Sequence, residues 1–333
     1  MSASLVHVLW TLVAISSGGL QFDAASGEPA PSEVLLAQPS LDPSPRPQGR
    51  LPFFYDLYTF KADGGGTTVV AAFAVEAGKL KRKRVSDGDR YRFNMTLLLA
   101  DTLLRSVTNR HDSVFVDLPR RMRGEHLLYT HIEVQAVPSQ TIRQTVFMTD
   151  ATEVGMGQMY WEYIEIPDYS GTELMLSDVA LGQPDARVGW ERKGATLALL
   201  PTGQVPSRAF DVYYEIYNLP EGNPYTTDIT VERVIDTSRE TADDRELIRI
   251  SFAGESAAGA DDTLPELRSV GTPFDKGTYR LTVTVTDLTT GRTATQSSTF
   301  EVQSSGLGAT MVPALRVAPL IRGDNRGDKG AGS

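Results

Sequence analysis

Few residues in this sequence have the type and spacing needed for chemistry. The paired carboxylates Asp243–Asp244 and Asp261–Asp262 lie in polar connections rich in Ala and Gly. Two carboxylates hydrolyse a glycosidic bond when they flank it in a cleft. These acidic loops therefore support one alternative, a carbohydrate-active or other hydrolytic enzyme. Adjacent acids on a connection are more typical of a solvated turn, and a weak calcium site is a further option.

Nucleophilic catalysis has less support. The sequence contains no Gly-x-Ser-x-Gly elbow, and its closest approach, Ser256, has no histidine in its own half of the chain. His126 and His131 are five residues apart, so on one strand they face opposite sides and cannot share a metal. The absence of cysteine excludes disulfides, thiol nucleophiles and iron–sulfur clusters. We therefore predict no catalytic residue, no metal and no cofactor.

An aromatic strand gives the sharpest binding hypothesis. In residues 210–217, Tyr213, Glu215 and Tyr217 share one face, and an acid between two aromatic rings could grip a sugar or a peptide. We predict that these three residues contact a partner. The alternative is that the rings pack the two halves of the chain together or lie under a long loop.

A basic run stands out in an otherwise acidic protein. The formal net charge of −10 argues against a general affinity for nucleic acid. Lys81, Arg82, Lys83 and Arg84 nevertheless form a compact cluster of positive charge. This cluster could contact a polyanion, or it could protect a sheet edge against unwanted pairing.

The elements that must position these residues are strands. In residues 278–302, Leu281, Val283 and Val285 alternate with threonines before a turn that contains Gly291. Period-two alternation of β-branched residues is the strand pattern. Similar short runs between turn residues fill residues 51–303 and predict antiparallel sandwiches.

The two halves of this region repeat each other. Residues 141–152 align without gaps on residues 278–289, with seven of twelve positions identical. Residues 54–58 (FYDLY) also match residues 213–217 (YYEIY). We interpret this as a tandem duplication. The fold prediction is all-β: two tandem immunoglobulin-like antiparallel β-sandwich domains of about seven strands each, with flexible N- and C-terminal segments.

The predicted domain limits follow from composition. Residues 1–25 contain an apolar run too short to span a bilayer, and we expect a signal peptide although its first residues lack Lys and Arg. Residues 26–50 are a Pro/Ser-rich linker, 51–168 and 169–303 are the two sandwich domains, and 304–333 are a flexible tail. We therefore expect an exported protein, periplasmic or extracellular, without a transmembrane span.

Several short sequence segments, taken in their order along the chain, resemble one bacterial family. They are residues 75–80, 90–92, 97–104, 174–181 (LMLSDVAL) and 212–219 (VYYEIYNL). The chain looks like the paired C-terminal β domains of GWxTD-domain proteins over roughly residues 51–303. It shows neither the naming pentapeptide nor the helical segment that carries it, and Gly189-Trp190-Glu191 is only a fragment. The resemblance implies a fold and no activity, and it raises the alternative that the chain is part of a longer member.

Taken together, these features predict a non-catalytic exported structural or interaction module. It would present β-sandwich faces to a protein or glycan partner of the cell envelope. A pocket with convergent polar groups would favour the hydrolytic alternative, whereas flat faces would favour the module.

Overall fold

The computed structural model describes residues 49–103, 107–119, 126–136, 140–184, 188–205, 209–234, 246–257, 262–271, 274–302, 311–313 and 315–316. All of them belong to one compact unit, which spans Pro45–Ser333. Among these residues the regular structure is β-strand apart from two short 3-10 helices, Ala77–Lys79 and Thr202–Gln204, so the all-β prediction is confirmed. No helix in these ranges has the length and apolar character to cross a membrane. The predicted leader, and the linker up to residue 48, lie outside the described residues.

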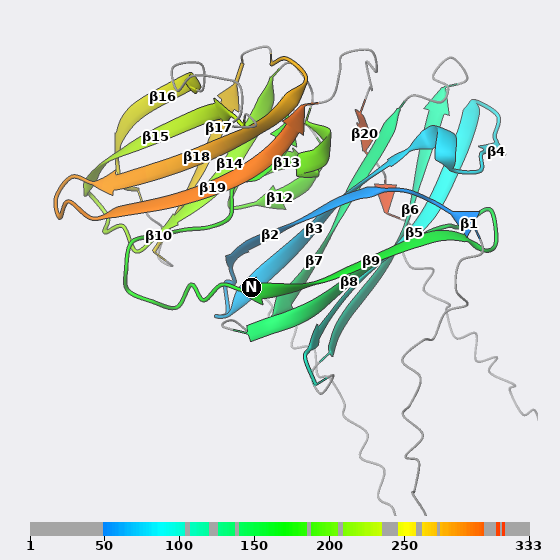
Figure 1. Cartoon of the computed structure of the whole chain (residues 1–333), viewed down its shortest axis with the longest axis horizontal. Coiled ribbons are helices and arrows are strands. Elements are labelled where there is room, and N and C mark those ends of the chain that lie inside the picture. Colours follow the sequence, from blue (N-terminus) through cyan, green and yellow to red (C-terminus); the bar gives the residue numbers. More distant parts are fainter. Residues whose placement is uncertain are drawn as a thin grey trace, which may run out of the picture. The chain divides into compact units, whose positions relative to one another are not determined.

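The first half of the described chain forms a sandwich of two sheets (Figure 1). One sheet has the order β2 (Phe54–Lys61), β3 (Thr67–Glu76), β7 (Leu127–Ala136) and β20 (Met311–Pro313). The other has the order β1 (Gly49–Arg50), β9 (Met156–Ile166), β8 (Gln140–Asp150), β5 (Gly88–Asp101), β6 (Val107–Pro119) and β21 (Leu315–Arg316), and β4 (Lys83–Arg84) also pairs with β5. Apolar side chains that alternate along both sheets, such as Phe73, Phe93 and Val146, are fully buried in one cluster.

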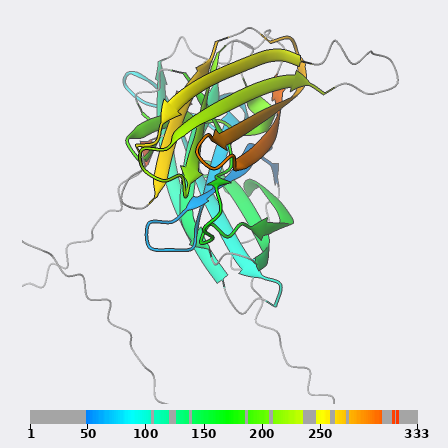
Figure 2. The same cartoon turned by 90° about the vertical axis from the view of Figure 1, so that its left-hand side faces the viewer.

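The second half repeats this architecture. One sheet has the order β10 (Met175–Leu176), β14 (Phe210–Tyr217), β11 (Ala180–Gln183), β13 (Ala195–Leu199) and β12 (Trp190–Arg192), and β17 (Thr263–Val270) pairs with β14. The other has the order β16 (Glu246–Glu255), β15 (Pro224–Arg233), β18 (Gly277–Asp287) and β19 (Thr293–Val302), the sheet turned towards the reader in Figure 2. As predicted from their alternation, Leu281, Val283 and Val285 are fully buried.

The strand order supports the predicted repeat. The series β9-β8-β5-β6 in the first half corresponds to β19-β18-β15-β16 in the second, and the pair β3-β7 corresponds to β14-β17. A shared series of four strands packed against a shared strand pair is the plan of an immunoglobulin-like sandwich in both halves. β8 and β18 both end in an aspartate that caps the following turn: Asp150 Oδ1 accepts from the Thr152 amide at 2.6 Å and Asp287 Oδ1 accepts from the Thr289 amide at 2.9 Å. The matching Asp of the aligned segments thus has one structural role in both halves.

One part of the sequence alignment is wrong by a strand. Residues 54–58 begin β2, an outer strand that pairs only with β3 among the described strands, whereas residues 213–217 belong to β14, which pairs with strands on both sides. The counterpart of β14 is β3. β14 pairs with β17, the strand that precedes β18, and β3 pairs with β7, the strand that precedes β8. Aromatic residues recur in both segments, although residues 54–57 are only half-buried and residues 213–217 are fully buried, and this similarity of composition produced the false match.

A third apolar cluster joins the two halves. Tyr58, Phe60, Val70 and Ala72 of β2 and β3 pack with Trp190, Leu197, Leu199 and Tyr213 of the second half, and all are buried. The predicted boundary at residue 168 falls between β9 and β10. The prediction that residues 304–333 are a flexible tail is wrong for two short strands, because β20 pairs with β7 and β21 pairs with β6.

Candidate binding surfaces

The predicted contact residues of β14 are buried. Tyr213, Glu215 and Tyr217 each have no exposed surface, because the first half covers the face that they share. Glu215 accepts hydrogen bonds from the hydroxyls of Tyr213 and Tyr217, both at 2.7 Å. Arg192 donates to the same carboxylate from Nε at 2.6 Å and from Nη2 at 2.9 Å. The prediction that these residues face an external partner is therefore corrected: their partner is the rest of the same chain.

The Glu215 cluster ties the second half to β2. Arg192 Nη2 donates to the Lys61 carbonyl at 2.6 Å, and the Tyr217 hydroxyl accepts from the Lys61 amide at 2.9 Å. Burial, with a further contribution from the charge of Glu215, raises the pKa of Tyr213 and of Tyr217 far above the usual value. Every oxygen of the Glu215 carboxylate is bonded, which is the condition under which a buried ion pair is tolerated. The cluster is a structural joint between the halves.

A second polar joint lies beside the first. Asp178 accepts from the Thr59 amide at 2.8 Å, from the Thr59 hydroxyl at 2.6 Å and from Gln296 Nε2 at 2.7 Å. Burial raises the pKa of Asp178, and the hydrogen bonds from Thr59 and Gln296 oppose that shift. These contacts connect β2, the segment between β10 and β11, and β19, so the joint also involves both sheets of the second half.

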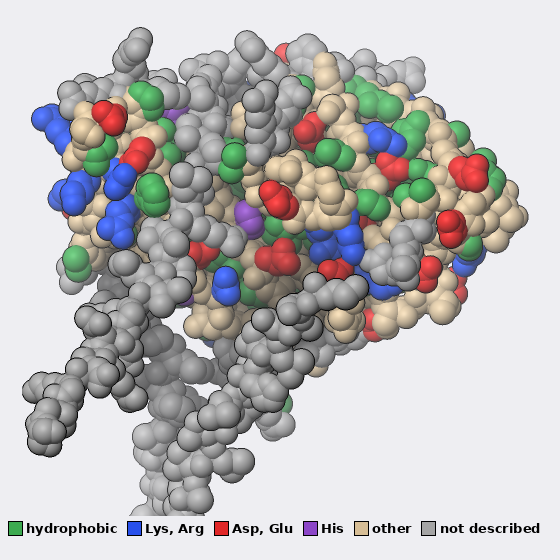
Figure 3. All heavy atoms as spheres, turned by 180° about the vertical axis from the view of Figure 1, so that it is seen from behind, with side chains coloured by type: hydrophobic (Ala, Val, Ile, Leu, Met, Phe, Trp, Pro, Cys, Tyr) green, Lys and Arg blue, Asp and Glu red, His purple; other side chains and the backbone are tan. Residues whose placement is uncertain are grey.

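The predicted basic cluster is exposed. Lys81, Arg82, Lys83 and Arg84 all lie on the surface, at the end of the first half that carries β4, where Figure 3 shows Lys and Arg side chains gathered. Two of the four have acidic partners: Lys81 Nζ lies 3.8 Å from Glu153 and Arg82 lies 3.2 Å from Asp89. β4 pairs with β5 through Lys83 and Arg84. A contact with a polyanion stays a prediction.

The acidic loops of the hydrolytic alternative are only partly described. Asp243, Asp244 and Asp261 lie outside the described residues. Asp262 has a left-handed backbone, with φ of 54°, and its carbonyl accepts from the Asn218 amide at 3.1 Å. In the described part of the chain no group of three or more His, Cys, Asp or Glu side chains could hold a metal ion.

The largest exposed aromatic side chains lie elsewhere, on the outer face of β9. Met159, Trp161 and Tyr163 are 49%, 53% and 57% exposed and stand two residues apart on the same face. The rings of Trp161 and Tyr163 are 6.0 Å apart at an interplanar angle of 86°. The guanidinium of Arg143, on the adjacent β8, lies 4.8 Å from the centre of the Trp161 ring. We call these four residues, with Phe147 of β8, the β9 face.

The register shows that these side chains form one surface. β8 and β9 place Phe147 opposite Met159, Thr145 opposite Trp161 and Arg143 opposite Tyr163. Thr96 of β5 lies opposite Phe147, and Leu98 lies opposite Thr145. Side chains directly opposite on neighbouring strands share a face. The β9 face therefore lies on the outer surface of the sheet of the first half that contains β9, β8 and β5.

The corresponding surface of the second half is polar. In the pairing of β18 with β19, Thr295, Ser297 and Thr299 lie opposite Thr284, Thr282 and Arg280. The aligned repeat makes these positions the counterparts of Met159, Trp161 and Tyr163. A threonine and a serine, Thr282 and Ser297, are hydrogen bonded across this surface at 2.9 Å. The first half thus carries aromatic side chains where its own repeat carries hydroxyls.

The sequence contains the signal that would have found the β9 face. Trp161 corresponds to Ser297 once a one-residue gap is placed in the turn that follows residues 141–152, as the strand register requires. A strand of a sandwich buries only one of its two faces, so apolar residues at both odd and even positions leave some of them exposed. β14 also has aromatic residues and an acid in alternation, but both of its faces are covered.

Comparisons with known proteins do not identify a family. No protein-family model and no curated protein sequence matches the chain. A crystal structure of red sea bream transglutaminase is 13% identical, with 75% of this chain and 31% of that chain covered, at a TM-score of 0.21. A calcium-binding mutant of Bacteroides uniformis beta-glucuronidase 2 is 9% identical, with 74% and 27% covered, at a TM-score of 0.26. The chain spans less than a third of the length of either structure.

Proposed function

We propose that this protein is a non-catalytic interaction module that binds a protein partner through the β9 face. The observation that supports this proposal is the row Met159, Trp161 and Tyr163, exposed on a sheet whose repeat presents only Ser and Thr at those positions. Trp, Tyr, Met and Arg are the residue types enriched in protein interfaces and in their energetic centres. A large exposed apolar cluster has a solvation cost that a binding role explains.

The geometry favours a protein over a glycan. Sugar rings stack best on open, parallel aromatic faces, but the rings of Trp161 and Tyr163 are nearly perpendicular. One face of Trp161 is also covered by the Arg143 guanidinium. An edge-to-face pair beside a guanidinium gives an uneven surface with both apolar and charged contacts, which suits side chains of a protein.

Affinity isolation with matched baits tests the proposal. The wild-type protein and the variant Trp161→Ser, which copies Ser297 of the repeat, are immobilised and exposed to a cell-envelope extract. We expect a partner that the wild type retains and the variant loses, while Ser297→Ala retains it. Equal recovery on all three baits would contradict the proposal, and binding of the wild type to a glycan array alone would replace it with the glycan alternative.

We also propose that the chain is exported and is related to the GWxTD-domain proteins, as its sequence phrases suggest. The apolar run within residues 1–25 supports export. Mass spectrometry of the protein from fractionated cells tests this: cleavage near residue 25 and recovery outside the cytoplasm are expected. An uncleaved cytoplasmic protein would contradict the proposal of export.

A further inference from the structure

β7 has an open edge. It pairs with β3 along its whole length, from Leu127 to Ala136. On its other side, β20 pairs only with Leu127, Leu128 and Tyr129. Beyond Tyr129, none of the strands that the structure describes pairs with this side of β7. An unpaired strand edge is a template for the addition of another extended segment.

The hydrogen-bond alternation shows which backbone groups point to this edge. The Ala77 amide donates to the His126 carbonyl at 2.8 Å, so these two residues form a hydrogen-bonded pair of the β3–β7 ladder. In an antiparallel ladder every second residue bonds to the same neighbour. Ile132 and Val134 therefore bond to β3, whereas the N–H and C=O groups of Glu133 and Gln135 point to the open side.

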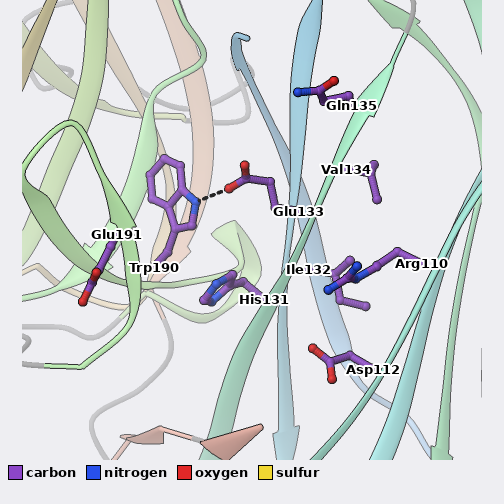
Figure 4. Close-up of a pocket in the computed structure, with 9 residues that line it drawn as sticks. All are labelled: Arg110, Asp112, His131, Ile132, Glu133, Val134, Gln135, Trp190 and Glu191. Atoms are coloured by element: carbon purple, nitrogen blue, oxygen red, sulfur yellow. Dashed lines mark hydrogen bonds between the residues drawn. The ribbon is translucent and has the colours of Figure 1, made fainter. Parts of the chain in front are cut away.

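A cavity of about 380 Å³ lies along the same stretch (Figure 4). β6 contributes Arg110 and Asp112, which project towards β7 in the figure, and β12 contributes Trp190 and Glu191. Trp190 Nε1 donates to Glu133 Oε2 at 2.9 Å and so fixes the position of that carboxylate. The lining contains three carboxylates, on Asp112, Glu133 and Glu191, and one guanidinium, on Arg110, and His131 is its remaining titratable group.

In the second half side chains bridge the corresponding edge, which no described strand pairs with either. β17 is the counterpart of β7, and its Arg268 is bonded to Glu266 at 2.5 Å. The guanidinium of Arg268 also lies 4.3 Å from the centre of the Phe252 ring on β16. These side chains bridge β17 and β16, whereas the first half has the cavity between β7 and β6. The cavity beside the unpaired edge, and not the unpaired edge itself, therefore distinguishes the first half among the described residues.

We propose that the open edge of β7 is a strand-addition site for an extended peptide segment of another protein that carries a Lys or Arg side chain. The backbone of the segment would pair with Glu133 and Gln135. Its basic side chain would enter the cavity, where carboxylates are in excess and the opposite charge is attracted. This site is separate from the β9 face and goes beyond the function proposed above.

A proline substitution tests the backbone pairing. Gln135→Pro removes the outward N–H without removing a bond to β3, and proline is tolerated on a strand edge. The probe is an acetylated and amidated hexapeptide in which valine and lysine alternate, measured by calorimetry. We expect saturable binding to the wild type, a loss of about tenfold or more in Gln135→Pro, and a change below about twofold in Gln135→Ala. Equal affinities of these two variants would overturn the proposal.

Changes in the peptide test the same site without altering the protein. N-methylation of alternate peptide amides removes strand donors and should abolish binding, as should replacement of each lysine by glutamate. Glu133→Gln and Asp112→Asn should each weaken the lysine peptide by about threefold or more. Undiminished binding of the N-methylated peptide would contradict strand addition. Self-association that Gln135→Pro abolishes would place a second copy of this chain on the edge and would also contradict the proposal.

Discussion

The strand series β9-β8-β5-β6 of the first half and β19-β18-β15-β16 of the second share a backbone plan and present different surfaces. β8 and β18 each end in an aspartate that caps the next turn, Asp150 in one half and Asp287 in the other. On the last strand, Trp161 in the first half corresponds to Ser297 in the second. Positions that the backbone requires are thus alike in the two halves, and positions that face solvent are not. The difference supports the proposal that the β9 face binds a partner.

A second contrast concerns two aromatic strands. β14 carries Tyr213 and Tyr217 around Glu215, and β9 carries Trp161 and Tyr163 beside Arg143. Both sets combine aromatic rings with a charged group. The first is fully buried by the other half of the chain, and the second is about half exposed. Aromatic side chains beside a charged group are therefore buried between the halves in one place and exposed in the other, according to what covers them.

The largest expected effect would come from breaking the buried set. Glu215→Ala leaves the Arg192 guanidinium and two tyrosine hydroxyls without their acceptor in a buried site. Removal of one partner from a buried ion pair costs about 3–5 kcal/mol. Chemical denaturation should show this loss for Glu215→Ala and less than about 0.5 kcal/mol for the exposed neighbour Glu191→Ala. A loss below about 1 kcal/mol at Glu215 would show that the joint is not structural.

A smaller effect is expected at the shared turn. Asp287 accepts hydrogen bonds from the Thr290 hydroxyl at 2.6 Å and from the amides of Thr289 and Thr290. Asp287→Ala should lower the free energy of unfolding by about 1–3 kcal/mol because hydrogen bonds to a charged acceptor are lost. Asp150→Ala should have a loss of similar size, since Asp150 accepts from three amides. A large loss at one aspartate alone would break the equivalence of the two halves.

The same aspartate gives a pH dependence. The hydrogen bond from the Thr290 hydroxyl, with those from the two amides, lowers the pKa of Asp287 below its ordinary value of 3.8. The folded state therefore prefers the ionised carboxylate, and its stabilisation is present above pH 3.8 and lost as the pH falls through the lowered pKa. The difference in unfolding free energy between wild type and Asp287→Asn should shrink from pH 5 towards pH 2, as measured by urea denaturation at each pH. A difference that grows on acidification would contradict this sign.

The smallest effect is expected in the basic cluster. Lys81→Glu with Lys83→Glu should change the unfolding free energy by less than about 0.5 kcal/mol, because both side chains are exposed. Retention on a sulfated-dextran column measures the predicted polyanion contact directly. A marked fall in retention for the double variant would support that contact, and unchanged retention would leave edge protection as the role of the cluster.

Particular residues show how far the sequence could predict this structure. The alternation of Leu281, Val283 and Val285 defined a strand and its buried face, because a sandwich covers one phase of each strand. The sequence alignment matched Asp150 with Asp287 because both halves need an aspartate side chain to cap the same turn. The burial of Glu215 was not predictable from β14 alone, since it depends on Arg192 and Lys61, which are distant in sequence. Packing between the halves, which local patterns do not encode, decided which aromatic strand was left open.

The most direct test of the central claim is a titration of the isolated partner against the wild type and against the variant Met159→Thr, Trp161→Ser, Tyr163→Thr, which gives the first half the surface of the second. We predict that the affinity falls by about 30-fold or more, as expected for the loss of an interface centre worth about 2 kcal/mol. The free energy of unfolding should change by less than about 1 kcal/mol, because these side chains are about half exposed and lie outside the core. An unchanged affinity in a folded variant would contradict the proposal that the β9 face binds the partner.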